Sequence, residues 1–332
     1  MGGLSTFNIQ HGYLEAVLRG FRSSFLKDSD YHHLSQCETL EDVRLNLAET
    51  DFGSSIANDS SVSPAIIERR SMEKLVKEFQ YLQTQATEPL TTFLEYIRIE
   101  YILENIMLLL RGTISGRNVN ELMQQCHPLG IFNENALRNI PTFEATPKGY
   151  AELYETVLVD TPVGKYFQQY LDASGAMFGT ASDMRNVLEE VQIEILKHSL
   201  SKYYIEDFYT FCSNLGGDSS EIMCSLLSAR ADRAAINITL NSFGTPLNEP
   251  HMRDTLRKRL YPSIGELYPA GTDLLSRADD EQKLTDSLRA YQEYHPILEK
   301  MTSLSADEYS IDDAFYKKEG MYEITPIVLD ST

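Results

Sequence analysis

The residues most suited to chemistry in this sequence are a cysteine and a histidine that follow one another, Cys126 and His127. A thiol beside an imidazole forms a nucleophile–base pair when the two side chains point at each other. Adjacent residues do not easily point together, and His127 precedes Pro128, which indicates a loop. We therefore predict a structural role for this pair.

An acidic cluster at Asp279, Asp280 and Glu281 has the composition of the magnesium motif of helical prenyl-diphosphate enzymes. That chemistry needs carboxylates one helical turn apart, so that both reach the same ion. These three residues are consecutive. Because acidic side chains are favoured in the first turn of a helix, the cluster predicts a solvated helix start.

No common phosphate-binding or zinc-binding pattern occurs. The nearest phosphate-binding candidate is the segment 112–117, which is too short and lacks the lysine that reaches the phosphates. No two histidines are four residues apart, as the common zinc pattern on a helix would need. The histidines are His11, His32, His33, His127, His198, His251 and His295. We predict no catalytic residue, no cofactor site and no metal site, and hence no enzyme.

Charge excludes two classes of partner. The chain has 29 Lys and Arg against 49 Asp and Glu, a net charge of −20. Such a surface repels phosphate backbones and anionic headgroups, so we predict neither nucleic-acid binding nor direct lipid insertion. The longest apolar run, Ile106–Leu110, is far too short for a transmembrane segment. Residues 1–6 fit the myristoylation pattern, and whether Gly2 is modified stays open.

The elements that the sequence predicts are almost all helical. Apolar residues recur at helical spacing from Ser182 to Leu215, and again from Ile222 to Phe243. Gly216 is suited to the end of the first helix. Asp218 and Glu221 have the spacing of a capping box at the start of the second. The first helix would be roughly 50 Å long at about 1.5 Å per residue, which indicates a mechanical or docking part.

The two predicted helices would fold back on each other as a hairpin. Further helical patterns precede this hairpin. Ser63 and Pro64 predict a helix start, and the pattern continues to Gly112 with a break at Pro89. Strand-like alternation is confined to Ile324–Leu329, which Pro326 interrupts. We therefore predict an all-α chain.

Three segments resemble one another: 37–47, 145–157 and 278–288. Each opens polar or acidic and continues as a short amphipathic helix, and their separation suits three small helical domains. We predict a first unit at 1–117, a second with the long hairpin at 118–244, and a third at 245–332. Long helices follow the first two segments but not the third, so the third unit is expected to be incomplete.

Arg233 lies in the apolar seam of the second hairpin helix, beside Asp232. A charge in such a seam is paired, or its head reaches water. Two interpretations stay open, an internal ion pair and a contact with another protein.

Many collinear segments carry a resemblance to a known family. They are Phe7–Gly20, Cys37–Asp42, Ala86–Tyr96, Cys126–Gly130, Leu158–Pro162, Tyr204–Tyr209, Leu215–Gly217, Ala231–Ala234, Asn237–Ser242 and Leu267–Pro269. Through them the chain resembles, nearly from end to end, the subunit d family of vacuolar-type proton ATPases.

The resemblance implies a funnel of helices built from three similar parts. It implies a non-catalytic subunit on the cytoplasmic face of vacuolar or endosomal membranes, bound peripherally. The expected partners are the proteolipid c-ring, the rotor subunits D and F, and subunit a. Within this interpretation the candidate interface residues are Tyr13, Glu15, Arg19, Arg233 and Asn241.

The resemblance is lost at the C-terminal end. Residues 321–332 do not match the family's aromatic C-terminal helices, and the chain has no tryptophan. A shortened third unit leaves an alternative function open. The chain would then be an assembly or scaffold factor that binds the pump without transmitting torque.

Overall fold

The computed structural model describes residues 11–56, 63–140, 161–177 and 189–303, together with 155, 158–159 and 314–315. Every regular element in these ranges is helical, so the predicted all-α class is confirmed. The chain forms two compact units, residues 1–97 and 98–332. The division into three units stays a prediction, as does the three-part funnel.

The first unit contains short helices and one long one. Its helices are α2 (Gly12–Ser23), α3 (Asp28–Ser35), α4 (Leu40–Ala48), α5 (Gly53–Ile56) and α6 (Pro64–Gln85), and α7 (Leu90–Ile114) begins in it and continues into the second unit. Leu14, Leu82 and Leu94 form its core, packed against partly buried side chains that include Phe21 and Phe79.

The predicted start of α6 is confirmed. The side chain of Ser63 accepts a hydrogen bond from the backbone N–H of Ile66, at 3.3 Å, and Pro64 occupies the first turn. The break at Pro89 is also confirmed, because α6 ends at Gln85 and α7 begins at Leu90.

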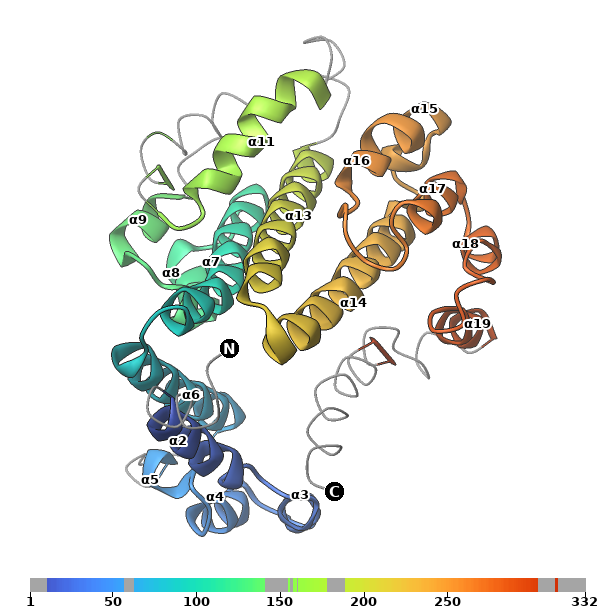
Figure 1. The fold of residues 1–332 in the computed structure, drawn as a ribbon. Coiled ribbons are helices and arrows are strands. Elements are labelled where there is room, and N and C mark those ends of the chain that lie inside the picture. The colour runs from blue at the N-terminus through green and yellow to red at the C-terminus, as the bar shows by residue number, and fades with distance from the viewer. Residues whose placement is uncertain are drawn as a thin grey trace. The chain divides into compact units, whose positions relative to one another are not determined.

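The second unit is built around the long helices α7, α13 and α14. Its further elements are α8 (Val119–Gln125), η1 (Pro128–Gly130), α9 (Glu134–Asn139), α11 (Gly164–Met177), α13 (Glu189–Leu215), α14 (Gly217–Ser242), η4 (Pro246–Asn248), α15 (Pro250–Met252), η5 (Arg253–Arg257), α16 (Lys258–Leu260), α17 (Ala270–Arg277), α18 (Glu281–Ser287) and α19 (His295–Ser303). In Figure 1, α13 and α14 meet at their turn and diverge away from it.

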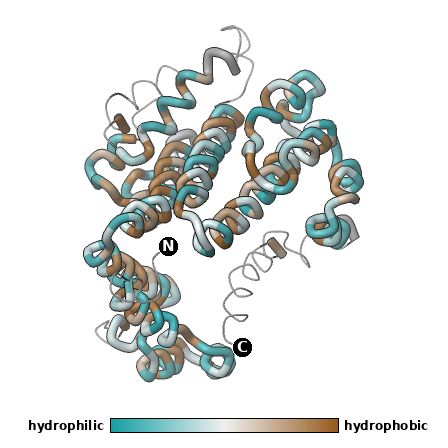
Figure 2. The backbone as a smooth tube through the Cα atoms, viewed as in Figure 1, coloured by the Kyte–Doolittle hydropathy of each residue, from teal (hydrophilic) through white to brown (hydrophobic). Residues whose placement is uncertain are grey.

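The core of the second unit lies along these long helices. Ile102, Ile106 and Leu109 of α7 are fully buried, as are Ile195 and Leu196 of α13. Figure 2 shows apolar residues concentrated along α7 and on parts of α13 and α14. At about 1.5 Å per residue, the 27 residues of α13 span about 40 Å. The predicted extension from Ser182 to residue 188 lies outside the described residues.

The predicted capping box of the second hairpin helix is wrong. Helix α14 begins at Gly217, its N-cap is Gly216, and no side chain caps it. Gly216 and Gly217 have positive φ angles of 71° and 61°, which glycine adopts without a steric penalty. The chain therefore reverses within one residue, and Asp218 falls inside the first turn. The predicted end of α13 before Gly216 is confirmed.

Of the three similar segments, the first and third form the predicted short helices, α4 and α18. The middle segment lies largely outside the described residues, and so does the strand-like run Ile324–Leu329.

Candidate functional site

Cys126 is buried, and the side chain of His127 makes contacts within the fold. Burial raises the pKa of the Cys126 thiol to about 11, so the thiol stays protonated at neutral pH. Nδ1 of His127 accepts a hydrogen bond from the backbone N–H of Leu129, at 3.2 Å. The His127 ring also stacks on Tyr101, with 4.1 Å between ring centres. His127 thus caps the short helix η1, as its loop position suggested.

The acidic cluster at 279–281 begins helix α18. Oδ1 of Asp280 accepts from the backbone N–H of Lys283, at 2.7 Å. Asp279 forms ion pairs with Arg253, at 3.3 Å, and with Lys283, at 2.5 Å. Among the described residues, no group of three or more His, Cys, Asp or Glu could hold a metal ion. In the same part of the chain, no helix is long and apolar enough to cross a membrane.

Three of the predicted interface residues lie on α2. Tyr13 is 60% exposed, and its hydroxyl contacts the hydroxyl of Tyr81 on α6. Glu15 and Arg19 form an ion pair one turn apart, with 38% and 81% of their side chains exposed. Such a pair contributes little to stability. Tyr13 and Glu15 are two residues apart on α2, so their side chains point to different sides of the helix, and the three residues do not form a single face.

The other two predicted residues, Arg233 and Asn241, belong to α14. Both line a cavity of about 270 Å³ between α7, α13 and α14. Asn241 also lines a larger cavity of about 620 Å³. The other walls of this cavity are Arg111 and Ser115, the first turns of α13, the last turn of α14, and Thr245 and Leu247. Lys197, His198 and Asn241 line both cavities. We call the two together the α13–α14 cleft.

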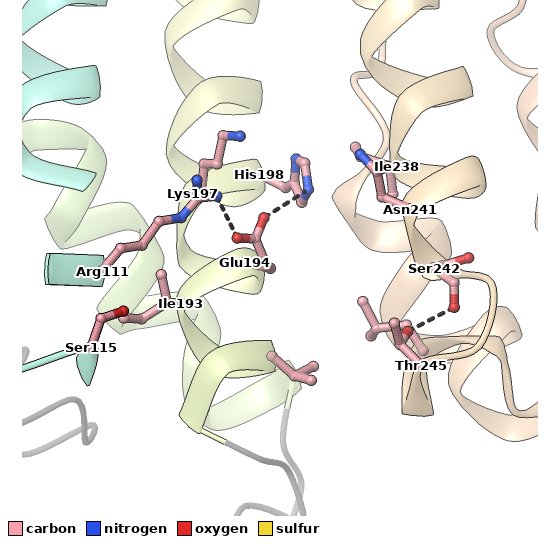
Figure 3. A pocket seen from close by; sticks show the side chains of 12 residues that line it. Arg111, Ser115, Ile193, Glu194, Lys197, His198, Ile238, Asn241, Ser242 and Thr245 are labelled. Carbon is pink, nitrogen blue, oxygen red and sulfur yellow. Dashed lines mark hydrogen bonds and ion pairs between the residues drawn. The ribbon is translucent and has the colours of Figure 1, made fainter. Parts of the chain in front are cut away.

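Charged side chains from α7 and α13 line the larger cavity (Figure 3). Arg111 forms an ion pair with Glu194, whose carboxylate also lies 3.7 Å from Nε2 of His198. Burial, with smaller effects of Lys197 and Arg111, lowers the pKa of His198 to about 3, so the ring is neutral at physiological pH. Burial and then the neighbouring Arg111 also lower the pKa of Lys197.

The smaller cavity contains a second ion pair. Arg230 of α14 bonds to Glu100 of α7, with 22% and 32% of the side chains exposed. Burial, followed by the repulsion of Glu100, raises the pKa of Glu104. The two ion pairs tie α7 to its neighbours α13 and α14 along the walls of the cleft.

Asp232, the neighbour of Arg233, turns to other partners. Its carboxylate accepts from the backbone N–H groups of Glu266 and Leu267, at 2.9 and 3.0 Å, and from the hydroxyl of Tyr294, at 2.8 Å. It therefore holds α14 to later parts of the chain. Neither interpretation of Arg233 is tested by this arrangement.

Sequence analysis missed Arg257, a fully buried arginine. Its guanidinium donates to Oγ of Ser242, at 2.8 Å, and to Oδ1 of Asn248, at 3.2 Å. It also donates to the backbone carbonyls of Leu275, Ser276 and Ala278, at 3.0, 2.8 and 2.6 Å. These carbonyls end helix α17, where orphan acceptors favour a cation. The basic run of residues 253–259 hides which residue is buried, so the sequence carried no usable signal.

Fold and site together define an all-helical protein in which three long helices line a charged cleft. The chain belongs to the ATP synthase (C/AC39) subunit family, whose sequence model matches residues 14–322.

Its relatives carry consistent names. The chain is 41% identical to V-type proton ATPase subunit d1 of Arabidopsis thaliana over 316 residues, which cover 95% of this chain and 83% of the relative. It is 39% identical to V-type proton ATPase subunit d of Dictyostelium discoideum over 320 residues, with 96% and 83% covered. It is 36% identical to V-type proton ATPase subunit d of Saccharomyces cerevisiae over 316 residues, with 94% and 83% covered.

Proposed function

We propose that this chain is a coupling subunit of a V-type proton ATPase and catalyses no reaction itself. It would link the central shaft, made of subunits D and F, to the proteolipid c-ring, so that rotation of one turns the other. One observation carries the proposal: the family match over residues 14–322, with relatives named V-type proton ATPase subunit d.

The helices suit this mechanical role. Helices α7, α13 and α14 have 25, 27 and 26 residues, about 40 Å each. Ion pairs connect α7 to both other helices, from Arg111 to Glu194 and from Glu100 to Arg230. Helices that pack together and are joined by ion pairs resist bending better than isolated helices. A coupling element must resist bending to transmit torque.

We further propose that the chain binds peripherally on the cytoplasmic face of vacuolar or endosomal membranes, beside subunit a. The candidate contacts are the α2 residues Tyr13, Glu15 and Arg19 and the cleft residues Arg233 and Asn241. The net charge of −20 supports contacts with protein rather than with anionic lipid.

The experiment is complementation of Saccharomyces cerevisiae cells that lack their own subunit d. We expect the chain to restore co-purification of the pump subunits and ATP-driven acidification of vacuolar vesicles. The yeast subunit and an empty vector serve as controls.

Two results separate the alternatives. A pump that assembles and hydrolyses ATP without acidifying vesicles would support an assembly or scaffold factor instead. A chain that is folded and expressed but absent from the purified pump would refute both functions.

A further inference from the structure

The α13–α14 cleft gathers positive charge in a strongly acidic chain. Arg111 and Lys197 line its larger cavity, and Arg230 and Arg233 line the smaller one. A cleft with low-dielectric walls concentrates the field of such groups. Three carboxylates, those of Glu100, Glu104 and Glu194, also line the two cavities, so the described lining has a small positive excess in a chain whose net charge is −20.

Lys197 feels the charges of Glu194 and Glu104 but is in direct contact with neither. Unlike Arg111 and Arg230, it makes no hydrogen bond or ion pair with any described residue, although its side chain is half-buried. In Figure 3 its ammonium group points away from the ion pair of Arg111 and Glu194. Burial lowers its pKa, which means that its charged form is poorly solvated where it stands. A negative group entering the cleft would stabilise that charge.

The charges limit what this negative group can be. In the larger cavity Arg111 is neutralised by Glu194, and His198 is neutral at physiological pH. Among the described residues that line this cavity, Lys197 therefore supplies the remaining positive charge. In the smaller cavity Arg230 pairs with Glu100. Counting Arg233 and the carboxylate of Glu104 as well, the described lining has four cations against three carboxylates, which is too small an excess to hold a polyanion such as a polyphosphate. A single carboxylate matches the cleft better.

The remaining lining indicates what surrounds that carboxylate. Val191 and Ile193 of α13, Ile238 of α14 and Leu247 of η4 line the larger cavity. Its volume of about 620 Å³, and the adjoining cavity of about 270 Å³, exceed what an isolated carboxylate fills. We propose that the α13–α14 cleft binds a peptide segment of a partner protein, with one Asp or Glu carboxylate on Lys197 and apolar side chains on either side. This inference rests on the proposed function only in taking the partner to be another subunit.

The test uses the full chain and a defined probe. The probe is a rhodamine-labelled, C-terminally amidated peptide Leu-Leu-Glu-Leu-Leu, compared with its Gln counterpart by fluorescence polarisation. We expect the Glu peptide to bind about tenfold more tightly than the Gln peptide, the effect of one charge-assisted hydrogen bond. Lys197→Gln should abolish this difference, and Lys197→Arg, which keeps the charge, should retain it.

A matched control is Lys202→Gln on the same helix. Lys202 donates to the backbone carbonyl of Arg259, at 2.9 Å, and lines neither cavity. This variant should bind both peptides as the unchanged chain does. Circular dichroism melting of each variant separates a binding defect from a folding defect.

Three results would overturn the proposal. They are equal binding of the Glu and Gln peptides, an unchanged preference in a folded Lys197→Gln, and displacement of the Glu peptide by inorganic phosphate or acetate at the peptide's own concentration. The last would assign the cleft to a small anion. None of them bears on complementation in yeast, so a failure here leaves the proposed function standing.

Discussion

At the scale of single residues, Asp232 shows how one buried carboxylate connects distant parts of the chain. Its partners Glu266, Leu267 and Tyr294 follow it by 34 to 62 residues. Burial opposes the charged form more strongly than these three donors favour it, and the pKa of Asp232 rises from 3.8 to about 6.

This shift gives a pH prediction for the variant Asp232→Asn. Between pH 3.8 and about 6, Asp232 is mostly protonated in the folded chain and mostly ionised in the unfolded chain. The contribution of Asp232 to stability is therefore full below this window, falls as the pH rises through it, and is constant above it. Relative to Asp232→Asn, the free energy of unfolding should drop by up to roughly 3 kcal/mol across the window. Urea denaturation at several pH values measures it, and a pH-independent difference would contradict the assignment.

Arg257 leads to a second residue-scale prediction. Replacing it with Met leaves the carbonyls of Leu275, Ser276 and Ala278 without their donor in a buried site. We expect a loss of roughly 3 kcal/mol in the free energy of unfolding, because unsatisfied buried acceptors are destabilising. The control is Arg289→Met, since Arg289 pairs at the surface with Asp286 and is 76% exposed. It should change stability by less than about 1 kcal/mol. Equal effects of the two variants would show that Arg257 has no special role.

At the scale of elements, the turn between α13 and α14 depends on glycine conformation rather than on a capping side chain. Gly216 has φ +71° and open space where a Cβ would stand. Gly216→Ala should therefore destabilise the chain by about 1–2 kcal/mol through backbone strain alone. Gly20 in α2 also has open space but ordinary helical geometry, so Gly20→Ala should stabilise by up to about 1 kcal/mol. Thermal unfolding checks both, and the same sign for both changes would refute the argument.

Helices of this chain could be predicted from local signals where those signals are strong. Ser63, Pro64 and Asp280 mark helix starts by chemistry that acts within one turn. Asp218 and Glu221 carried an equally good local signal that did not decide the start of α14, because the conformation of Gly216 already began the helix. A local pattern cannot reveal which of two competing caps is used.

Contacts in the candidate site were harder to predict than its elements. Arg233 and Asn241 were expected on one helix, and both line the cleft. Arg111, Lys197 and His198 come from other helices, and only their packing makes them neighbours. The bonds of Arg257 and Asp232 join residues up to 62 positions apart, which spacing along a sequence does not encode.

At the scale of the whole molecule, α7 is the continuous element that passes from the first compact unit into the second, with the boundary at Ile97 and Arg98. If the chain transmits torque, any force carried along the chain between the units passes through this helix. A helix interior is weakened by glycine, by about 1 kcal/mol per residue relative to alanine. The stiffness of α7 near the boundary should therefore limit coupling.

The final prediction tests this with a matched pair of double variants. The double variant Glu95→Gly, Arg98→Gly loosens α7. The double variant Glu95→Ala, Arg98→Ala keeps the helix. Both remove the same two side chains, and with them the hydrogen bonds from Arg98 to the carbonyls of Leu129 and Ile131. In yeast cells complemented with each, we expect similar assembly but fewer protons transported per ATP hydrolysed with the glycine pair. Equal ratios in assembled pumps would mean that α7 does not transmit torque. That result would favour an assembly factor over a coupling subunit, because a factor that only binds does not need a stiff helix.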